Sequence, residues 1–368
     1  MRLVPIESVP EGCYLSKTIY DTEGRILLRK GTKLRKSLIN RIKNLKIYSL
    51  YITDNYTDKE IEEIISPELK QKSILLVKDV FSTFSRISSE SSHCSFKDKM
   101  KLIEQKENYL KSIEELAEEL YDSVISNKNL LVGLVDIKTM DAYTYQHSVN
   151  VALISTVIGT GFNLPKKDLI DLCIGALLHD LGKIFVGKEI IQKPGKLTDE
   201  EFEIIKTHPK KGFDYVLTND NINKNCRNII VQHHEKVDGS GYPLGLKSDE
   251  IAFLSKIVAV ADVYDALTSN RPYKRAMCPS EAFEFILSNA NIMFDFEVTK
   301  VFAKVLFPYS KGTLVKLSNG EIGCVLKLHQ FYPLRPCLEI IESPIESRIG
   351  SIIDLSQELS LVICAIEF

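Results

Sequence analysis

The sequence of 368 residues lacks tryptophan altogether and contains only five methionines and seven histidines. Its eight cysteines include no CxxC pair. This scatter excludes a cage of closely spaced thiolates and argues against a disulfide framework, so reduced thiols are expected. Neither sign of charge dominates, because 47 basic side chains face 49 acidic ones. Such a chain has no overall field that attracts nucleic acid, so we expect no nucleic-acid partner and only local binding of anions.

Long hydrophobic runs are also missing. The longest stretch without a formal charge, 148–165, contains too many polar and small residues to span a membrane. The first residues, MRLVPIESVPEG, contain acidic residues and prolines where a signal peptide needs an unbroken apolar segment. We therefore expect a cytoplasmic protein without a membrane span.

The hydrophobic pattern divides the chain into four parts. Residues 1–60 alternate short apolar runs with turn residues and predict a small β-containing module. Residues 61–129 have helical periodicity, except for a serine-rich joint at 82–95 that we predict to be a loop. Residues 130–308 read almost entirely as apolar helices, and residues 309–368 contain Asn-Gly between alternating runs, which is typical of a hairpin in a small β module. The predicted fold class is mainly α, with an all-helical core domain between two β-containing modules.

Seven polar residues stand within otherwise apolar helical segments of this core. A lone histidine in such a place is usually a hydrogen-bonded core residue, but seven buried polar groups in one domain are best satisfied together by metal ions. Nitrogen and oxygen ligands without thiolate favour iron, manganese or zinc. Because the set exceeds the three protein ligands usual for one catalytic zinc, we predict two metal ions bridged by a carboxylate. The residues are His147, His179, Asp180, His208, His233, His234 and Asp262.

Lys183 follows His179 by four residues, so a continuous helix would direct both side chains to the same face. The alternative is a solvated lysine at a helix end. The apolar residues around the His-Asp pair favour instead a cation that lines the site and stabilises charge on a phosphate. Other enzyme templates do not fit. The segment GALLHDLGK lacks the spacing of a P-loop, and HHEKVD lacks the second histidine of a zincin. DGSGYP lacks the first glycine of a nucleophile elbow.

Taken in order, HD at 179–180, HHE at 233–235, DGSGYP at 238–243 and RPYK at 271–274 resemble the HD-GYP family, a branch of the HD-domain phosphohydrolases. The resemblance covers residues 134–296. It implies an HD-type helical bundle as the catalytic core. It also implies hydrolysis of the bacterial second messenger cyclic di-GMP to pGpG by a metal-bridging hydroxide, with a second cleavage to GMP left open.

Carried over by position, the resemblance implies that the seven residues above are metal ligands and that Asp180 is the catalytic bridge. The implied metal is iron, with manganese as the alternative. Relatives with three metals have a glutamate four residues before the first histidine, where this sequence has Tyr143, so we predict two ions. The implied substrate contacts are Lys183, which is also catalytic, Tyr242, Arg271 and Lys274, and the GYP loop is Gly241, Tyr242 and Pro243.

Other interpretations remain open at this point. A cyclic-dinucleotide receptor without turnover would keep the pocket and signal to partner proteins through the GYP loop or the β modules. A phosphodiesterase for another cyclic dinucleotide, such as cyclic GMP-AMP, would use the same ligands. The complete set of ligand positions favours the enzyme. The apolar stripe of the helix expected over 101–125 is consistent both with a homodimer and with packing on its own domain.

Overall fold

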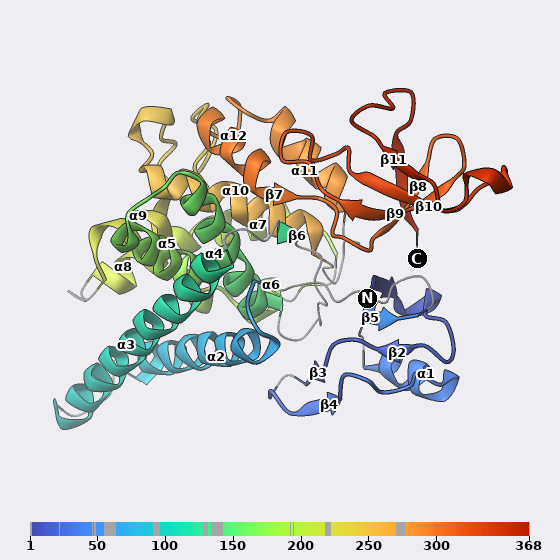
Figure 1. The fold of residues 1–368 in the computed structure, drawn as a ribbon. Coiled ribbons are helices and arrows are strands. Elements are labelled where there is room, and N and C mark those ends of the chain that lie inside the picture. Colours follow the sequence, from blue (N-terminus) through green and yellow to red (C-terminus); the bar gives the residue numbers. More distant parts are fainter. Residues whose placement is uncertain are drawn as a thin grey trace.

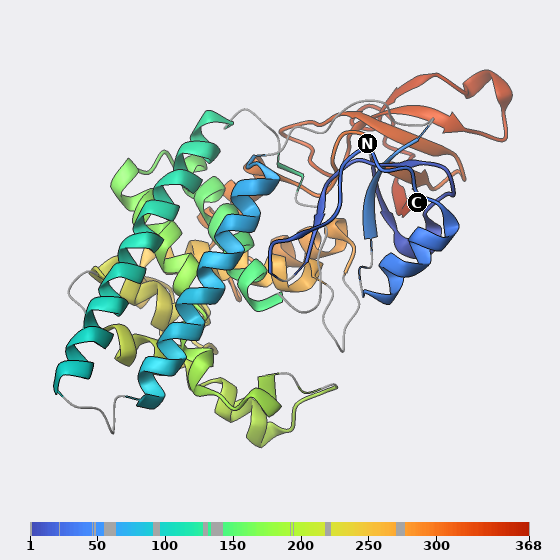
Figure 2. The same ribbon diagram turned by 90° about the horizontal axis from the view of Figure 1, so that it is seen from below.

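The computed structural model describes every residue except 1, 22, 46, 48, 55–63, 91–95, 128–131, 134–142, 192, 194, 218–221, 270–276 and 368. A bundle of helices occupies the centre of the chain, and a small β-containing module precedes and follows it (Figure 1). Both views place the two β modules on the same side of the bundle, while the long helices α2 (Pro67–Glu90) and α3 (Phe96–Ser126) extend to the opposite side (Figure 2). The predicted mainly α fold is confirmed.

The innermost helices are α4 (Tyr143–Gly161), α5 (Lys166–Leu178) and α10 (Phe253–Thr268). Their sequences are apolar on nearly every side, which is typical of helices surrounded by protein. In α5, Gly175 allows Ile229 to approach so closely that an added Cβ would lie 2.4 Å from its Cδ1. Around these helices lie η2 (Leu181–Phe185), α6 (Lys188–Ile191), α7 (Asp199–Ile205), α8 (His208–Leu217), α9 (Lys224–Gln232), η3 (Ser248–Glu250), α11 (Pro279–Ser288) and α12 (Phe296–Val305).

The serine-rich stretch differs from its prediction. We predicted a loop over 82–95, but α2 continues through Glu90, so the prediction is wrong for residues 82–90. The reason is that Val77, Phe81, Phe84 and Ile87 recur at helical spacing and are buried in the main core. Their burial stabilises the helix, and the serines occupy the positions between them.

The helix predicted over 101–125 is the body of α3. Its apolar residues Leu110, Ile113, Leu116 and Leu120 are buried in the same core as α2, α4 and α5. This burial supports packing of the stripe on its own domain. No helix in the described parts of the chain is long and apolar enough to cross a membrane.

The N-terminal module has its own small core. Its three-stranded sheet has the order β1 (Arg2–Pro5), β5 (Ser49–Thr53), β2 (Tyr14–Leu15), and the module also contains η1 (Ile6–Ser8) and α1 (Lys36–Asn44). A ribbon of β3 (Ile19–Tyr20) and β4 (Ile26–Leu28) contacts the helical bundle. The contact is close, since a Cβ added to Gly24 in the turn of the ribbon would lie 2.6 Å from Leu75 Cδ1 of α2.

The C-terminal module is an antiparallel sheet with a third core. Its strand order is β11 (Ile352–Asp354), β10 (Cys337–Glu342), β9 (Ile322–Lys327), β8 (Leu314–Leu317), β12 (Ile363–Glu367). The Asn-Gly hairpin predicted from the sequence joins β8 and β9, which pair Leu314 with Cys324. A short parallel pair, β6 (Val132–Gly133) with β7 (Leu306–Phe307), and the turn η4 (Glu346–Arg348) complete the described elements.

Candidate metal centre

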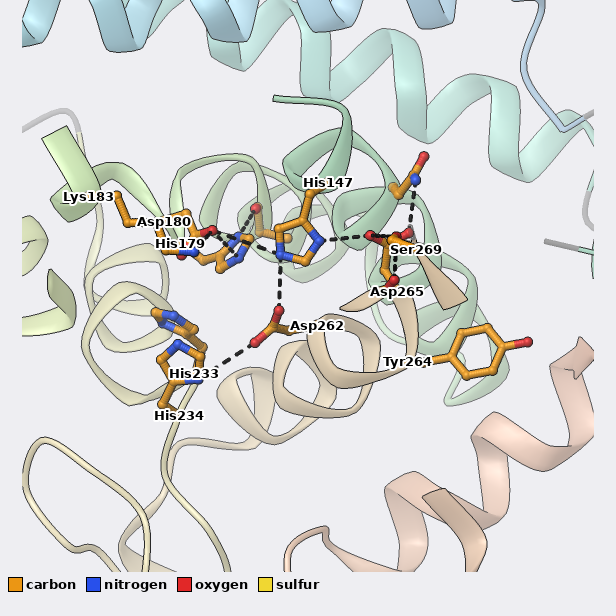
Figure 3. A network of polar contacts seen from close by, with 12 residues as sticks. His147, His179, Asp180, Lys183, His233, His234, Asp262, Tyr264, Asp265 and Ser269 are labelled. Carbon is orange, nitrogen blue, oxygen red and sulfur yellow. Dashed lines mark hydrogen bonds and ion pairs between the residues drawn. The ribbon is translucent and has the colours of Figure 1, made fainter. Parts of the chain in front are cut away.

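The seven predicted ligands converge in the middle of the bundle. Figure 3 labels all of them except His208. Most of them stand where a helix begins or ends. His179 caps the C-terminus of α5, and His208 is the first residue of α8. His233 caps the C-terminus of α9, and Asp262 lies within α10. Residues far apart in the sequence thus meet because the helices that carry them pack on one another.

Two groups of possible metal ligands overlap at Asp180. In one group, ligand atoms of Asp180, His208, His233 and His234 all lie within 4.8 Å of one another. In the other, atoms of His147, His179 and Asp180 satisfy the same limit. The shared carboxylate is 1% exposed. Because Asp180 belongs to both groups, its carboxylate could offer a ligand atom to a metal ion in each of them.

Asp262 adds a second carboxylate to the cluster. Its Oδ1 lies 3.0 Å from His147 Nε2, and its Oδ2 lies 3.6 Å from His234 Nδ1. The carboxylate thus lies between a histidine of each group. This places it within reach of both positions.

Three histidines are held in the same way by their own helices. The Nδ1 atoms of His179, His208 and His233 lie 2.7 Å, 2.7 Å and 3.0 Å from the carbonyl oxygens of the residues three positions earlier. A carbonyl oxygen only accepts, so Nδ1 must carry the hydrogen and Nε2 keeps a lone pair in the neutral ring. These Nε2 atoms are the ones that face the cluster, which is the tautomer that metal binding requires.

Burial and neighbouring charges fix the protonation of these groups. Burial lowers the pKa of His179, and burial with the surrounding histidines lowers the pKa of His233 well below its usual range. Burial also lowers the pKa of His234 to about 3. Burial acts to raise the pKa of Asp180, but Lys183 and the nearby histidines outweigh it and hold this pKa well below its usual range. Neutral imidazoles at His179, His233 and His234 and an ionised carboxylate at Asp180 are the forms that bind metal ions.

Unpaired buried atoms supply an independent test of whether a metal fits. Among the described residues, the buried side-chain atoms without a hydrogen-bond partner include His179 Nε2 and Asp180 Oδ1, while Ser155 Oγ and Ser255 Oγ are examples outside the cluster. Buried polar atoms in proteins are normally paired, since each one left unsatisfied costs about 1–3 kcal/mol. His179 and Asp180 belong to the groups described above. The donor set and the orphaned atoms therefore fit divalent metal ions.

Asp265 supports His147 from behind and was not predicted. Its Oδ2 accepts a hydrogen bond from His147 Nδ1 at 2.8 Å, and its Oδ1 accepts one from Asn150 Nδ2 at 2.8 Å. Ser269 Oγ lies 3.1 Å from the same carboxylate. Burial acts to lower the pKa of His147, but Asp262 and Asp265 raise it to about 9. The only hint in the sequence is the spacing of Asp265, one helical turn after Asp262.

Replacing Asp265 with asparagine should weaken metal binding by roughly 10–100-fold, as is usual when a carboxylate behind a ligating histidine is lost. Asparagine keeps the size of the side chain but removes the charge that orients the His147 ring. Competition with a chromogenic chelator measures the change. Asp295→Asn is a suitable control, because Asp295 caps α12 and pairs with Lys256 outside the cluster. Equal metal affinity in Asp265→Asn and the wild type would contradict this role.

Lys183 reaches the cluster by a route that differs from the one expected. We expected a continuous helix, but α5 ends at Leu178 and the chain continues as the 3-10 turn η2. The tighter turn places Lys183 Nζ 2.6 Å from Asp180 Oδ2, and the lysine side chain stays 29% exposed. Lys183 therefore contacts the shared carboxylate and also faces solvent.

The GYP loop is fixed against the cluster by Glu235, a second residue whose role was not predicted. The buried Glu235 carboxylate accepts hydrogen bonds from the backbone N–H groups of Leu244 at 2.7 Å and Leu246 at 2.9 Å. Gly241 passes so close to residue 235 that an added Cβ would lie 2.5 Å from its Cα. As a result the centroid of the Tyr242 ring lies 4.8 Å from that of the His234 ring, with the two planes inclined at 32°. Arg271 and Lys274, the other predicted substrate contacts, lie outside the described residues.

Comparison with known families agrees with this geometry. The model of the HD domain family matches residues 124–298. These residues, just under half of the chain, are similar to HD domains. A second model, described as a KOW domain associated with HD domains, matches residues 314–367 beyond the HD domain.

Curated relatives of the HD domain act on cyclic dinucleotides. The chain is 38% identical over 229 residues to the cyclic di-GMP phosphodiesterase PA4108 of Pseudomonas aeruginosa. The aligned region covers 62% of this chain and 55% of that protein. It is 35% identical over 173 residues to the 3'3'-cGAMP-specific phosphodiesterase 3 of Vibrio cholerae. This aligned region covers 47% of this chain and 37% of that protein. The chain thus spans about half the length of these relatives or less.

A solved structure shares the fold. Bd1817, an HDG"Y"P protein from Bdellovibrio bacteriovorus, matches with a TM-score of 0.53 and 18% identity over 82% of this chain and 97% of that one. At this identity the match supports the fold alone. Together with the family and the relatives, it confirms the predicted resemblance to HD-GYP proteins.

Proposed function

We propose that this chain is a metal-dependent phosphodiesterase that hydrolyses cyclic di-GMP to pGpG. The observation that carries the proposal is the position of Asp180, whose carboxylate belongs to both groups of candidate ligands. A carboxylate so placed fits a bridge between two divalent ions, and paired ions suit in-line displacement at a phosphodiester. The substrate named for the Pseudomonas relative supports the choice of cyclic di-GMP.

In this proposal the cluster holds two ions, with iron as the expected metal and manganese as the alternative. Bound ions supply Lewis acidity and lower the pKa of a water molecule. The protein holds the imidazoles of His179, His233 and His234 neutral and Asp180 ionised, and it excludes bulk water. Of the seven proposed ligands, only His234 has more than a tenth of its side chain exposed, at 24%. The proposed ligands are His147, His179, Asp180, His208, His233, His234 and Asp262.

Lys183 has a distinct part in the proposal, because its ammonium group can neutralise a phosphate oxygen as charge builds up there. Lys183→Met should leave metal content near that of the wild type and lower kcat by roughly 10²-fold, as loss of one such electrostatic contact does. Metal analysis and steady-state kinetics on the same preparation measure the two quantities. Loss of metal in this variant would show instead that the lysine is structural.

Lys210→Met is the matched control for that variant. Lys210 pairs with Asp214 at 2.6 Å, as Lys183 pairs with Asp180. Both residues of this pair lie on α8, are more than half exposed and stand outside the metal cluster. Unchanged kcat is expected.

The decisive experiment is anaerobic purification with metal analysis, followed by chromatography of nucleotide digests. We expect cyclic di-GMP to disappear and pGpG to form, with any GMP appearing later. Binding of cyclic di-GMP without turnover by the metal-loaded protein would contradict the proposal and support a receptor that signals through its β modules or GYP loop. Faster turnover of 3'3'-cGAMP would support the substrate named for the Vibrio relative. Both substrates are intracellular messengers, in keeping with the expected cytoplasmic location.

A further inference from the structure

The cluster reaches solvent on one side. Lys183 and His234 are the exposed members of the site, at 29% and 24% of their side chains. Figure 3 shows both residues at one side of the cluster and the supporting Asp265 at the opposite side. A substrate must therefore approach from the side of Lys183 and His234.

Two aromatic rings continue the surface from His234 outward. Tyr242 packs against His234 at an inclination of 32°, and Phe202 of α7 meets Tyr242 with ring centroids 6.5 Å apart and planes at 81°. Phe202 is 43% exposed. One face of this ring is thus free of its aromatic neighbour and close to the approach side of the cluster.

The exposure of Phe202 is not required by the fold of α7. None of the residues of this short helix is buried. Its start is fixed by a capping box between Thr198 and Glu201, and Glu201 is tied to Lys193. Polar contacts therefore hold the helix in place, and an exposed phenylalanine adds little to the core.

A positive charge accompanies the rings. Lys206 Nζ lies 4.9 Å from the centroid of Phe202 and 6.0 Å from that of Tyr242. It pairs with Glu203, one turn earlier on the helix. The ring of Phe202 thus provides a flat apolar surface, and Lys206 provides a cation next to it. The neighbouring metal cluster has a second partly exposed cation, Lys183.

This combination suits a ligand with a planar ring attached close to a phosphate. In a nucleotide, the base and the phosphate are carried by the same ribose. A phosphodiester held at the cluster therefore brings a base next to it, and bases stack on exposed aromatic side chains without need of a specific hydrogen-bond pattern.

We propose that Phe202, Tyr242 and Lys206 form a binding subsite for one base of the nucleotide substrate. Phe202 offers the exposed part of its ring as the stacking surface, Tyr242 holds that ring in place, and Lys206 attracts the anionic ligand and lies beside the stacked base. The inference rests on the proposed function for its substrate class, but it concerns binding of the base and not the hydrolytic step.

The test compares two probes that differ by the base alone, GMP and ribose 5-phosphate. Their binding to the metal-loaded full-length chain is measured by calorimetry. Phe202→Leu removes the ring but keeps an apolar side chain of similar reach, and Phe202→Tyr keeps the ring. Ile204→Ala is the matched control, because Ile204 is 41% exposed on the same helix.

We expect Phe202→Leu to weaken GMP binding by about tenfold or more, within the range of base stacking on aromatic residues, and to leave ribose 5-phosphate unchanged. Phe202→Tyr should restore GMP binding, and Ile204→Ala should bind both probes like the wild type. Lys206→Met should weaken both probes. Lys210→Met should not, although Lys210 is also an ion-paired lysine, with Asp214 at 2.6 Å.

Three results would overturn the subsite. These are unchanged GMP binding in Phe202→Leu, equal losses for both probes in that variant, and wild-type protein that binds GMP no better than ribose 5-phosphate. Equal losses would mean that the ring only supports Tyr242. Failure of the proposed function gives a different pattern, in which cyclic di-GMP survives while GMP binding still depends on Phe202.

Discussion

Replacement of Asp180 by asparagine is expected to abolish retention of metal and hydrolysis of cyclic di-GMP together, while the helical core stays folded. The carboxylate belongs to both groups of proposed ligands, and a neutral amide cannot bridge two cations. Activity should fall by at least the roughly 10²–10³-fold that loss of a single electrostatic contact costs. Metal analysis, nucleotide chromatography and far-ultraviolet circular dichroism on one preparation measure all three properties.

Asp171→Asn is the matched control for Asp180→Asn. Asp171 is also buried but lies within α5, and its oxygens accept hydrogen bonds from Asn223 and Asn225 and not from the cluster. Its substitution should lower the free energy of unfolding by about 1–3 kcal/mol and leave the metal content unchanged. If Asp180→Asn kept full activity, the assignment of the metal centre would be wrong.

Gly182→Ala is expected to damage the site without touching any ligand. An added Cβ would lie 1.8 Å from the carbonyl oxygen of His208 and 2.7 Å from the backbone nitrogen of Gly212. Both contacts are with backbone, so η2 would have to move away from α8. Overpacking of this kind costs about 1–3 kcal/mol and occasionally more. Because η2 follows Asp180 and α8 begins with His208, the same movement should separate proposed ligands and release metal.

Gly187→Ala is the matched control for Gly182→Ala, because it also replaces a glycine by alanine but at a position that does not contact the backbone of another helix. Its added Cβ would meet only the side chain of Glu189, which can rotate away. We expect a change in unfolding free energy within about 0.5 kcal/mol, as for most surface substitutions. Urea unfolding of the metal-free proteins gives the comparison. A Gly182→Ala protein that unfolds at the wild-type urea concentration and keeps its metal would refute the argument.

Much of the site could be predicted because its residues are conspicuous in the sequence. Histidine is scarce in this chain, and an imidazole or carboxylate in an apolar helix needs a partner. The sequence could not show that the helix stops at Leu178, since GALLHDLGK has the composition of an uninterrupted helix. Lys183 therefore contacts Asp180 through a tighter turn than the one we expected.

The missed features depend on packing in three dimensions. In the sequence, little distinguishes Asp265 and Glu235 from acidic residues of the surface. Their roles become visible only in the fold, where Asp265 contacts His147 and Glu235 accepts hydrogen bonds from the loop after Tyr242. The loop predicted for the serine-rich part of α2 is wrong because the burial of Phe81, Phe84 and Ile87, which recur at helical spacing, outweighs the local composition. In both cases a tertiary contact outweighs the local preference of the sequence.

The bonds that tie His179, His208 and His233 to their own helices have a thermodynamic consequence. Each ring is oriented by a carbonyl group of the preceding helical turn, before any cation arrives. Ordering a flexible side chain on binding costs about 0.5–1.5 kcal/mol. For these three ligands that entropy is lost when the helices form, so a metal ion meets a preorganised set of donors. The orientation of each donor is thus a local property of its helix end, and the spacing between donors is a property of the whole bundle.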